Sequence, residues 1–286
     1  MTSISILFSQ GISDYSYNSA ESSSLAGSIV SIKGDTWSLF NNPASLVEIQ
    51  ENKFSIGYSH LYNQKYLPMS SIGLVISKYD INFGVKYNSF QVDYKGVELL
   101  RDDQIGFVSA IDLMRDKNSS LSVGVSTNLY MMDFAPSAGV TGDGSFGLSD
   151  SKVTTFGLDI GLLATLRNKN RLGVFIKNIN SPSIGRGISS QKLPRKIDLG
   201  LSTMPSENFI ITFSFEQLLG NKDAQFKTSF KYQLSKVLVL NTGVQMNPNR
   251  FGIGFILNKK SISLSYAFLT HHILPGTHQC NVGMKF

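Results

Sequence analysis

Histidine is the residue type in this chain best suited to metal binding or proton transfer, and three of the four histidines lie close together in the sequence. His271, His272 and His278 flank one predicted outer loop near the C-terminus, whereas His60 stands apart. A neutral imidazole is a frequent metal ligand, and its charge changes near neutral pH. No aspartate or glutamate lies near the three clustered histidines, so their spacing favours solvated loop residues. We therefore predict no metal and no cofactor.

Two further patterns with chemical potential are equally weak. Residues 139–144 (GVTGDG) are glycine-rich like a phosphate cradle, but they follow no strand-to-helix unit and lack the P-loop lysine. Serine, histidine and aspartate are all present, yet no spacing favours a catalytic triad. We predict that the protein is not an enzyme; the alternative enzyme classes are the phospholipases and proteases built on membrane barrels.

The C-terminal residues reveal the element that organises the rest of the chain. Over residues 279–286 polar and apolar side chains alternate without a break. A period of two places the two sets on opposite faces of one strand. The apolar set is Cys280, Val282, Met284 and Phe286, and the polar or small set is Gln279, Asn281, Gly283 and Lys285.

The same alternation recurs about fourteen times after residue 52. An even number of strands, each about 9–12 residues long, is typical of a closed antiparallel barrel in a bacterial outer membrane. The inward face is rich in Gly, Ser, Asn and Lys, as a water-filled lumen would be. The predicted strands are 53–62, 71–77, 79–88, 104–113, 121–129, 155–162, 172–176, 196–202, 209–215, 225–234, 238–246, 250–257, 261–268 and 279–286.

Connection lengths support a barrel because they alternate along the chain. Short periplasmic turns and longer extracellular loops are the usual arrangement in such barrels, which predicts that both termini are periplasmic. The tight set is Lys78, 115–119, 168–170, 205–207, 235–236 and 259–260. The longer set is 61–68, 94–103, 134–152, 180–194, 218–223 and 271–276, with 247–249 as a short exception.

The composition argues against other classes of protein. Charged residues make up only 16% of the 286 positions, and no apolar run approaches the roughly 20 residues of a membrane-spanning helix. The net charge of +6 comes from scattered lysines and arginines without interleaved stacking aromatics, so we expect no nucleic-acid partner. Cys280 is the only cysteine and cannot form an intrachain disulfide. A soluble β-sandwich or a trimeric fibre, which would also alternate, remains the alternative fold.

The N-terminal part follows a different pattern. Residues 1–10 have the character of a signal-peptide remnant, with a flexible N-terminus as the alternative. Residues 11–52 lack alternation and are predicted to form a hatch in the lumen of the barrel formed by residues 53–286. Asp35 is predicted to cap a helical turn that runs through Phe40. Pro43 would end this turn, because the residue before proline is disfavoured in a helix.

Three parts of the sequence resemble one family. Asp35 and the run Asn42-Pro43-Ala44 resemble the N-terminal plug signature of FadL-like barrels, and more closely that of the PorV/PorQ family. Residues 266–286 are similar to the last hairpin of that family, and residues 193–200 to one of its strand openings. The resemblance implies a fourteen-stranded barrel with a hatch motif of Asp35, Asn42, Pro43 and Ala44.

The resemblance also implies two possible roles. PorV-type members serve type IX secretion, so the expected partners are secretion-system subunits and cargo. FadL-type members pass hydrophobic small molecules, for which the inward apolar residues would form a track. The alternative, which we favour, is that these residues pack against the hatch. Outer-membrane lipid and the barrel-insertion machinery are expected partners in either case, with Phe286 as the insertion signal. The inward apolar positions are Val75, Leu163, Phe175, Ile210, Val237 and Val239; the charged positions predicted to line the lumen are Lys86, Asp159, Lys177, Asp198, Lys227 and Lys231.

Overall fold

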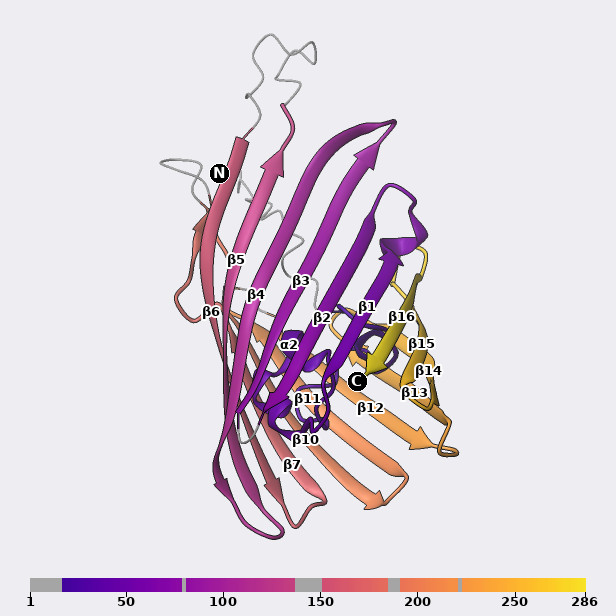
Figure 1. The fold of residues 1–286 in the computed structure, drawn as a ribbon. Helices are drawn as coiled ribbons and strands as arrows, with labels where there is room; N and C mark the ends of the chain where they lie inside the picture. Colours follow the sequence, from indigo (N-terminus) through magenta and orange to yellow (C-terminus); the bar gives the residue numbers. More distant parts are fainter. Residues whose placement is uncertain (1–16, 79–80, 137–150, 185–190, 221–222) are drawn as a thin grey trace, which may run out of the picture.

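Fourteen antiparallel strands close into a barrel in the computed structural model, which confirms the predicted fold (Figure 1). The structure describes residues 17–78, 81–136, 151–184, 191–220 and 223–286. The first and last strands close the barrel, with Lys53 opposite Lys285 and His60 opposite His278. The barrel strands are β1 (Lys53–His60), β2 (Pro68–Lys78), β3 (Ile81–Tyr94), β4 (Val97–Arg115), β5 (Ser120–Phe134), β6 (Ser151–Leu166), β7 (Asn170–Lys177), β10 (Lys196–Ser206), β11 (Phe209–Leu218), β12 (Gln225–Gln233), β13 (Leu238–Met246), β14 (Arg250–Lys259), β15 (Ile262–Leu269) and β16 (Thr277–Lys285).

Side-chain alternation explains why these segments form a membrane barrel. On β5, Ser122, Gly124 and Ser126 face the interior and are buried, whereas Val125 and Leu129 face outward and are exposed. A bilayer offers no hydrogen-bond partners, so a closed ladder is needed to pair every backbone group. No helix of the described residues is long and apolar enough to cross a membrane.

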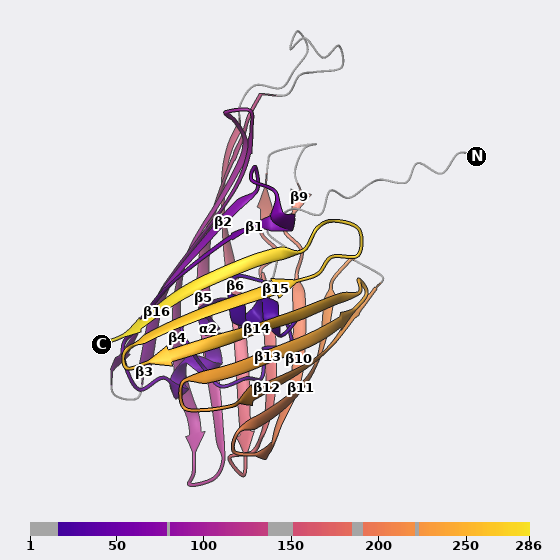
Figure 2. The same ribbon diagram turned by 90° about the vertical axis from the view of Figure 1, so that its right-hand side faces the viewer.

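The strands differ in length, which makes one wall taller than the rest. β3 to β6 contain 14, 19, 15 and 16 residues, whereas β1 and β7 contain 8 each. Figures 1 and 2 show this wall rising well beyond the strands coloured orange and yellow. A separate two-stranded sheet, β8 (Ser183–Ile184) with β9 (Gln191–Lys192), lies in the connection between β7 and β10.

The predicted long connection over residues 94–103 is wrong. β3 and β4 instead form a continuous hairpin whose turn consists of Lys95 and Gly96, with φ of 52° and 81°. Two positive φ angles are the signature of the two-residue turn that matches the twist of a hairpin. Asp103, the last residue of the expected connection, is accommodated in β4 because it accepts hydrogen bonds from the Tyr87 hydroxyl at 2.9 Å and from Arg101 Nε at 2.8 Å.

Residues 17–52, called the inner segment from here on, lie inside the barrel (Figures 1 and 2). They contain three short helical pieces, and Ser19 begins the first with a reciprocal capping box to Ser22. These pieces are α1 (Ala20–Ser24), α2 (Ser38–Asn41) and the 3₁₀ helix η2 (Pro43–Glu48); a further 3₁₀ turn, η3 (Leu61–Asn63), follows β1.

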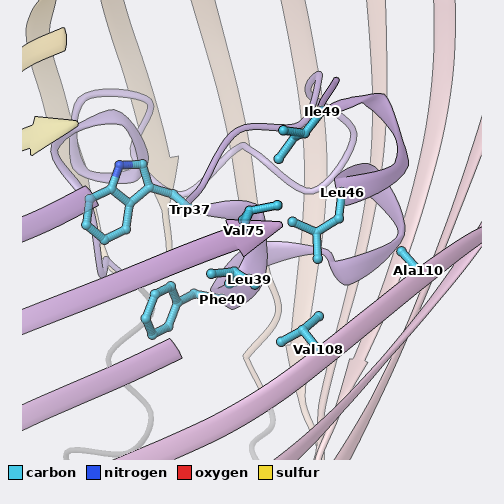
Figure 3. Close-up of a cluster of buried hydrophobic side chains, with 8 residues drawn as sticks. All are labelled: Trp37, Leu39, Phe40, Leu46, Ile49, Val75, Val108 and Ala110. Atoms are coloured by element: carbon cyan, nitrogen blue, oxygen red, sulfur yellow. The ribbon is translucent and has the colours of Figure 1, made fainter. Parts of the chain in front are cut away.

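The main apolar core joins the inner segment to the barrel wall. Figure 3 shows Trp37, Leu39 and Leu46 of the inner segment beside Val75 of β2 and Val108 of β4. Leu39, Leu46 and Val75 are fully buried. Burying one leucine side chain stabilises a fold by about 2 kcal/mol. The expectation of a water-filled lumen is therefore wrong here, because side chains of the inner segment occupy the space.

Candidate functional site

The inward glycines of the strands are the surface against which the inner segment packs. A Cβ atom on Gly124 of β5 would lie 2.4 Å from the backbone nitrogen of Ala44, and one on Gly243 of β13 would lie 2.3 Å from the backbone carbon of Leu25. Neither position can accept a side chain unless the inner segment moves. The sequence suggested that these glycines face water, whereas they allow a close approach of two backbones.

Asn42 connects the inner segment to itself and to the barrel. Its side-chain amide donates to Val30 O at 2.7 Å and to Leu162 O of β6 at 3.2 Å, and its carbonyl accepts from Ala44 N at 3.1 Å. Pro43 is the first residue of η2, where a missing N–H costs nothing. Asn42, Pro43 and Ala44, three residues of the proposed hatch motif, thus hold this part of the inner segment in place.

The fourth motif residue, Asp35, acts differently from the prediction. The helix α2 begins at Ser38, its N-cap is Trp37, and no side chain caps it. Asp35 instead closes a turn just before the helix. Its Oδ1 accepts from Trp37 N at 2.9 Å, and its backbone N–H donates to Ser38 Oγ at 3.1 Å. α2 does end at Asn41, as Pro43 predicts, because Asn42 is extended.

Lys86 of β3 and Asp159 of β6 form a buried polar contact with the inner segment. Lys86 Nζ donates to Leu39 O at 2.8 Å and lies 3.8 Å from Asp159 Oδ2. The Asp159 carboxylate also accepts from Asn128 Nδ2 at 2.7 Å and from Asn178 N at 2.8 Å. Buried charges are tolerated when they are paired and hydrogen-bonded in this way.

Four charged side chains form a second buried cluster on β10, β11 and β12. Glu216 accepts from Lys227 at 2.7 Å and from Lys196 at 3.2 Å. Asp198 is buried in the same cluster, near the two lysines. Lys227 also approaches the inner segment, because its Nζ lies 3.0 Å from where a Cβ on Gly27 would be. The positive φ of 77° at Gly27 suits glycine, so the chain turns beside this lysine.

The remaining predicted residues are distributed over the barrel. Lys231 of β12 forms an ion pair with Glu21 of α1. Lys177 lies opposite Lys196 where β7 pairs with β10, and it is half-buried. Phe286 lies beyond the end of β16, is 63% exposed, and donates its backbone N–H to Asn52 O at 3.0 Å. Its role as an insertion signal stays a prediction.

Several charged residues of the interior were not predicted from the sequence. Glu21 of the inner segment forms an ion pair with Lys231 of β12. Glu48, also in the inner segment, forms one with Arg171 of β7, whose guanidinium nitrogen lies 3.1 Å from its carboxylate. Glu216 shares the inward parity of Ser214, so alternation could have placed it inside the barrel. The pairing partners could not be found in this way, because they lie on strands distant in sequence.

The expected apolar lining of the lumen is present only in part. Val75, Leu163 and Phe175 are buried, and Val75 packs against the inner segment. Val237 is 49% exposed and precedes β13, so its placement inside the barrel was wrong. Inward apolar residues therefore support the packing of the inner segment, at least around Val75.

The histidines have structural contacts. His271 Nδ1 accepts from Leu274 N at 3.0 Å and so stabilises its own loop, and His278 Nδ1 lies 2.7 Å from the Tyr266 hydroxyl. In the ranges that the structure describes, no group of three or more potential ligands could hold a metal ion. The glycine-rich run 139–144 lies outside the described residues.

Two carboxyl groups of the inner segment share one environment. Burial and the adjacent Glu21 carboxyl raise the pKa of Asp35 to about 8. Burial also favours a higher pKa for Glu21, but the ammonium of Lys231 outweighs it and holds that pKa below its ordinary value. At neutral pH Glu21 is therefore ionised, whereas Asp35 retains a proton.

The raised pKa of Asp35 predicts a pH-dependent stability. Between about pH 4 and pH 8 the folded state keeps a proton that the unfolded chain has lost, so stability falls as the pH rises through this window. Between these two pH values, we expect the free energy of unfolding of the wild type to fall by about 2 kcal/mol more than that of Asp35→Asn. Urea titrations followed by the fluorescence of Trp37, the single tryptophan, measure this difference.

Asparagine retains the oxygen that accepts from Trp37 N, so the turn before α2 is preserved in this variant. Glu51→Gln changes an exposed carboxylate and serves as the control. Equal pH slopes for the wild type and Asp35→Asn would contradict the assignment of the proton to Asp35.

Comparison with known proteins gives one family and one fold. The family described as type IX secretion system membrane protein PorP/SprF matches residues 89–284, which is more than half of the chain. No curated protein sequence matches the chain.

Solved structures show the same architecture. The CymD monoaromatic hydrocarbon channel has a TM-score of 0.70 at 12% identity, with 94% of this chain and 97% of that chain covered. The toluene transporter TbuX of Ralstonia pickettii has a TM-score of 0.65 at 10% identity, covering 96% and 98%. The toluene transporter TodX of Pseudomonas putida has a TM-score of 0.61 at 11% identity, covering 93% and 96%. At these identities the similarity shows the fold alone.

Proposed function

Because the chain belongs to the PorP/SprF family of type IX secretion system membrane proteins, we propose that it supports protein export as a blocked barrel. The family membership supports a role in type IX secretion, and the narrower resemblance to PorV/PorQ stays a prediction. An outer-membrane location agrees with the closed barrel and its apolar exterior.

One observation carries the proposal that the barrel does not itself conduct cargo. The inner segment is held to opposite parts of the wall, by Lys86 of β3 at Leu39 and by Lys231 of β12 at Glu21. Freeing it would separate buried charges from their partners, which is costly. A barrel closed in this way suits a docking component of the export machinery, with secretion subunits and cargo as its partners.

The topology suggests an orientation. The connections at the rim where β16 ends, called the turn end from here on, are all short. The opposite rim carries the long connections, together with the tight turns at 95–96 and 247–249. Outer-membrane barrels usually have their short turns in the periplasm. We propose that the turn end is periplasmic.

Deleting the gene tests this function. We expect type IX cargo to disappear from the medium and to return when the wild-type gene is restored, because cargo would lack its docking component. Affinity purification of the tagged barrel in mild detergent should recover secretion-system subunits. Unchanged export in the deletion strain, together with a barrel recovered alone, would refute the proposal.

Passive transport of a hydrophobic small molecule is the second candidate. It is supported by the fold shared with hydrocarbon channels and by the buried apolar residues of the wall. It requires a passage around or through the inner segment. Slower uptake of an aromatic hydrocarbon by the deletion strain, with normal export, would favour this role.

A further inference from the structure

A cavity of about 550 Å³ lies at the turn end, between the inner segment and the strands β12 to β16 and β1. Trp37 and the loop before it form one side, and Ser55 of β1 and Ser263 of β15 lie on the other. The exposed side chains of Lys236 and Lys260, in the turns after β12 and β14, mark its mouth. Its volume is in the range of sites that hold small ligands or short peptide segments.

The charges around this turn-end cavity do not balance. Six lysines and three carboxyl groups line it. Two lysines are neutralised, because Lys231 pairs with Glu21, and Lys285 Nζ lies 3.1 Å from Glu51 Oε2. The lysines that form no ion pair with any described carboxylate are Lys33, Lys53, Lys236 and Lys260. Asp35, the third carboxyl, retains its proton at neutral pH and adds no negative charge.

The spacing of these lysines indicates the kind of anion. They come from four separate segments: the inner segment, the start of β1 and two different turns. Lysines are flexible point charges, so they suit several separated negative groups better than one compact group held in a rigid fork. Serine hydroxyls and the apolar side chains of Val239 and Ile256 lie between them.

We propose that the turn-end cavity binds an acidic peptide segment of a periplasmic partner. Carboxylates of the peptide would meet the four unpaired lysines, its backbone would bond the serine hydroxyls, and its apolar side chains would contact Val239 and Ile256. The periplasmic setting rests on the proposed function, whereas the preference for acidic peptide rests on the cavity itself. An inorganic anion would leave the apolar residues uncovered, and a lipid tail would meet lysines and serines.

Purified protein in detergent micelles allows a direct test. The probe is a fluorescein-labelled octapeptide of alternating Glu and Ala, compared with its Gln-Ala analogue by fluorescence anisotropy. We expect the acidic peptide to bind at least about tenfold more tightly, and its affinity to fall as salt rises from low to physiological concentration. Lys236→Gln with Lys260→Gln should weaken binding about tenfold.

Lys259→Gln is the matched control, because Lys259 is adjacent in sequence to Lys260 but does not line the cavity. It should change the affinity less than about twofold. A heat-modifiability gel confirms that each variant is folded. If the double variant is not folded, Lys33→Gln gives the same test at an exposed side chain and should weaken binding about threefold.

Three outcomes would overturn the inference. Equal binding of the Gln-Ala peptide would exclude recognition of carboxylates. Equal weakening by Lys259→Gln would show general attraction to a basic rim. Displacement of the peptide by phosphatidylglycerol vesicles, but not by phosphatidylcholine vesicles, would assign the cavity to lipid headgroups. Each result is independent of cargo export, so the proposed function and this inference can fail separately.

Discussion

Gly124→Val is expected to displace the inner segment from the barrel wall. The first added atom would lie 2.4 Å from the backbone of Pro43 and of Ala44, and backbone atoms cannot move aside alone. Asn42, next to Pro43, is hydrogen-bonded to Val30 and to β6, so strain would spread along the inner segment. Overpacking a core costs about 1–3 kcal/mol, and we expect at least about 3 kcal/mol here.

The emission of Trp37 makes this displacement measurable. Its indole is only 5% exposed and belongs to the same core as Leu39 and Leu46, so its release should shift emission to longer wavelength. The urea midpoint should fall, and residues of the inner segment should become sensitive to protease. Gly124→Ala should give a smaller change of the same kind.

Thr127→Val is the matched control on the same strand. Thr127 has the opposite parity from Gly124, so valine there faces away from the inner segment. We expect its midpoint and emission to equal those of the wild type. If Gly124→Val also behaved like the wild type, the close packing of η2 against β5 would be disproved.

The barrel could be predicted from the sequence because its pattern is local. In β16 the position of each residue along the strand determines which face of the sheet it occupies. Gln279, Asn281 and Gly283 point inward, as predicted, and Val282 and Met284 are exposed on the outside. The prediction failed at the β3–β4 hairpin, where residues 94–103 were expected to form a long connection. Hydrogen bonds to Tyr87 and Arg101, which the sequence does not reveal, keep Asp103 in the strand.

The interior was harder to predict, for two physical reasons. Glycine has no side chain, so Gly124 and Gly243 are equally compatible with a wet wall and with tight backbone packing. The contacts that hold the inner segment also join residues distant in sequence, such as Lys231 and Glu21, which are 210 positions apart. The sequence suggested that residues 11–52 enter the lumen, but not which strands they would touch.

Glu216→Gln is expected to be strongly destabilising for an electrostatic reason. Its carboxylate accepts from two lysines at 2.7 and 3.2 Å, and the Lys227 side chain is only 1% exposed. Glutamine keeps the shape of the side chain and removes the negative charge that Lys196 and Lys227 share. Removing one partner of a buried ion pair costs about 3–5 kcal/mol, and we expect a loss in this range by urea unfolding.

A double-mutant cycle separates the charge effect from a loss of packing. If uncompensated charge is the cause, Glu216→Gln combined with Lys227→Gln should be more stable than Glu216→Gln alone, because the second change removes the stranded ammonium. Glu51→Gln, which breaks the exposed pair with Lys285, should cost less than about 1 kcal/mol. Additive losses in the double variant would show that Glu216 and Lys227 do not stabilise each other. The ion pairs would then no longer explain how the chain near Gly27 is held beside Lys227.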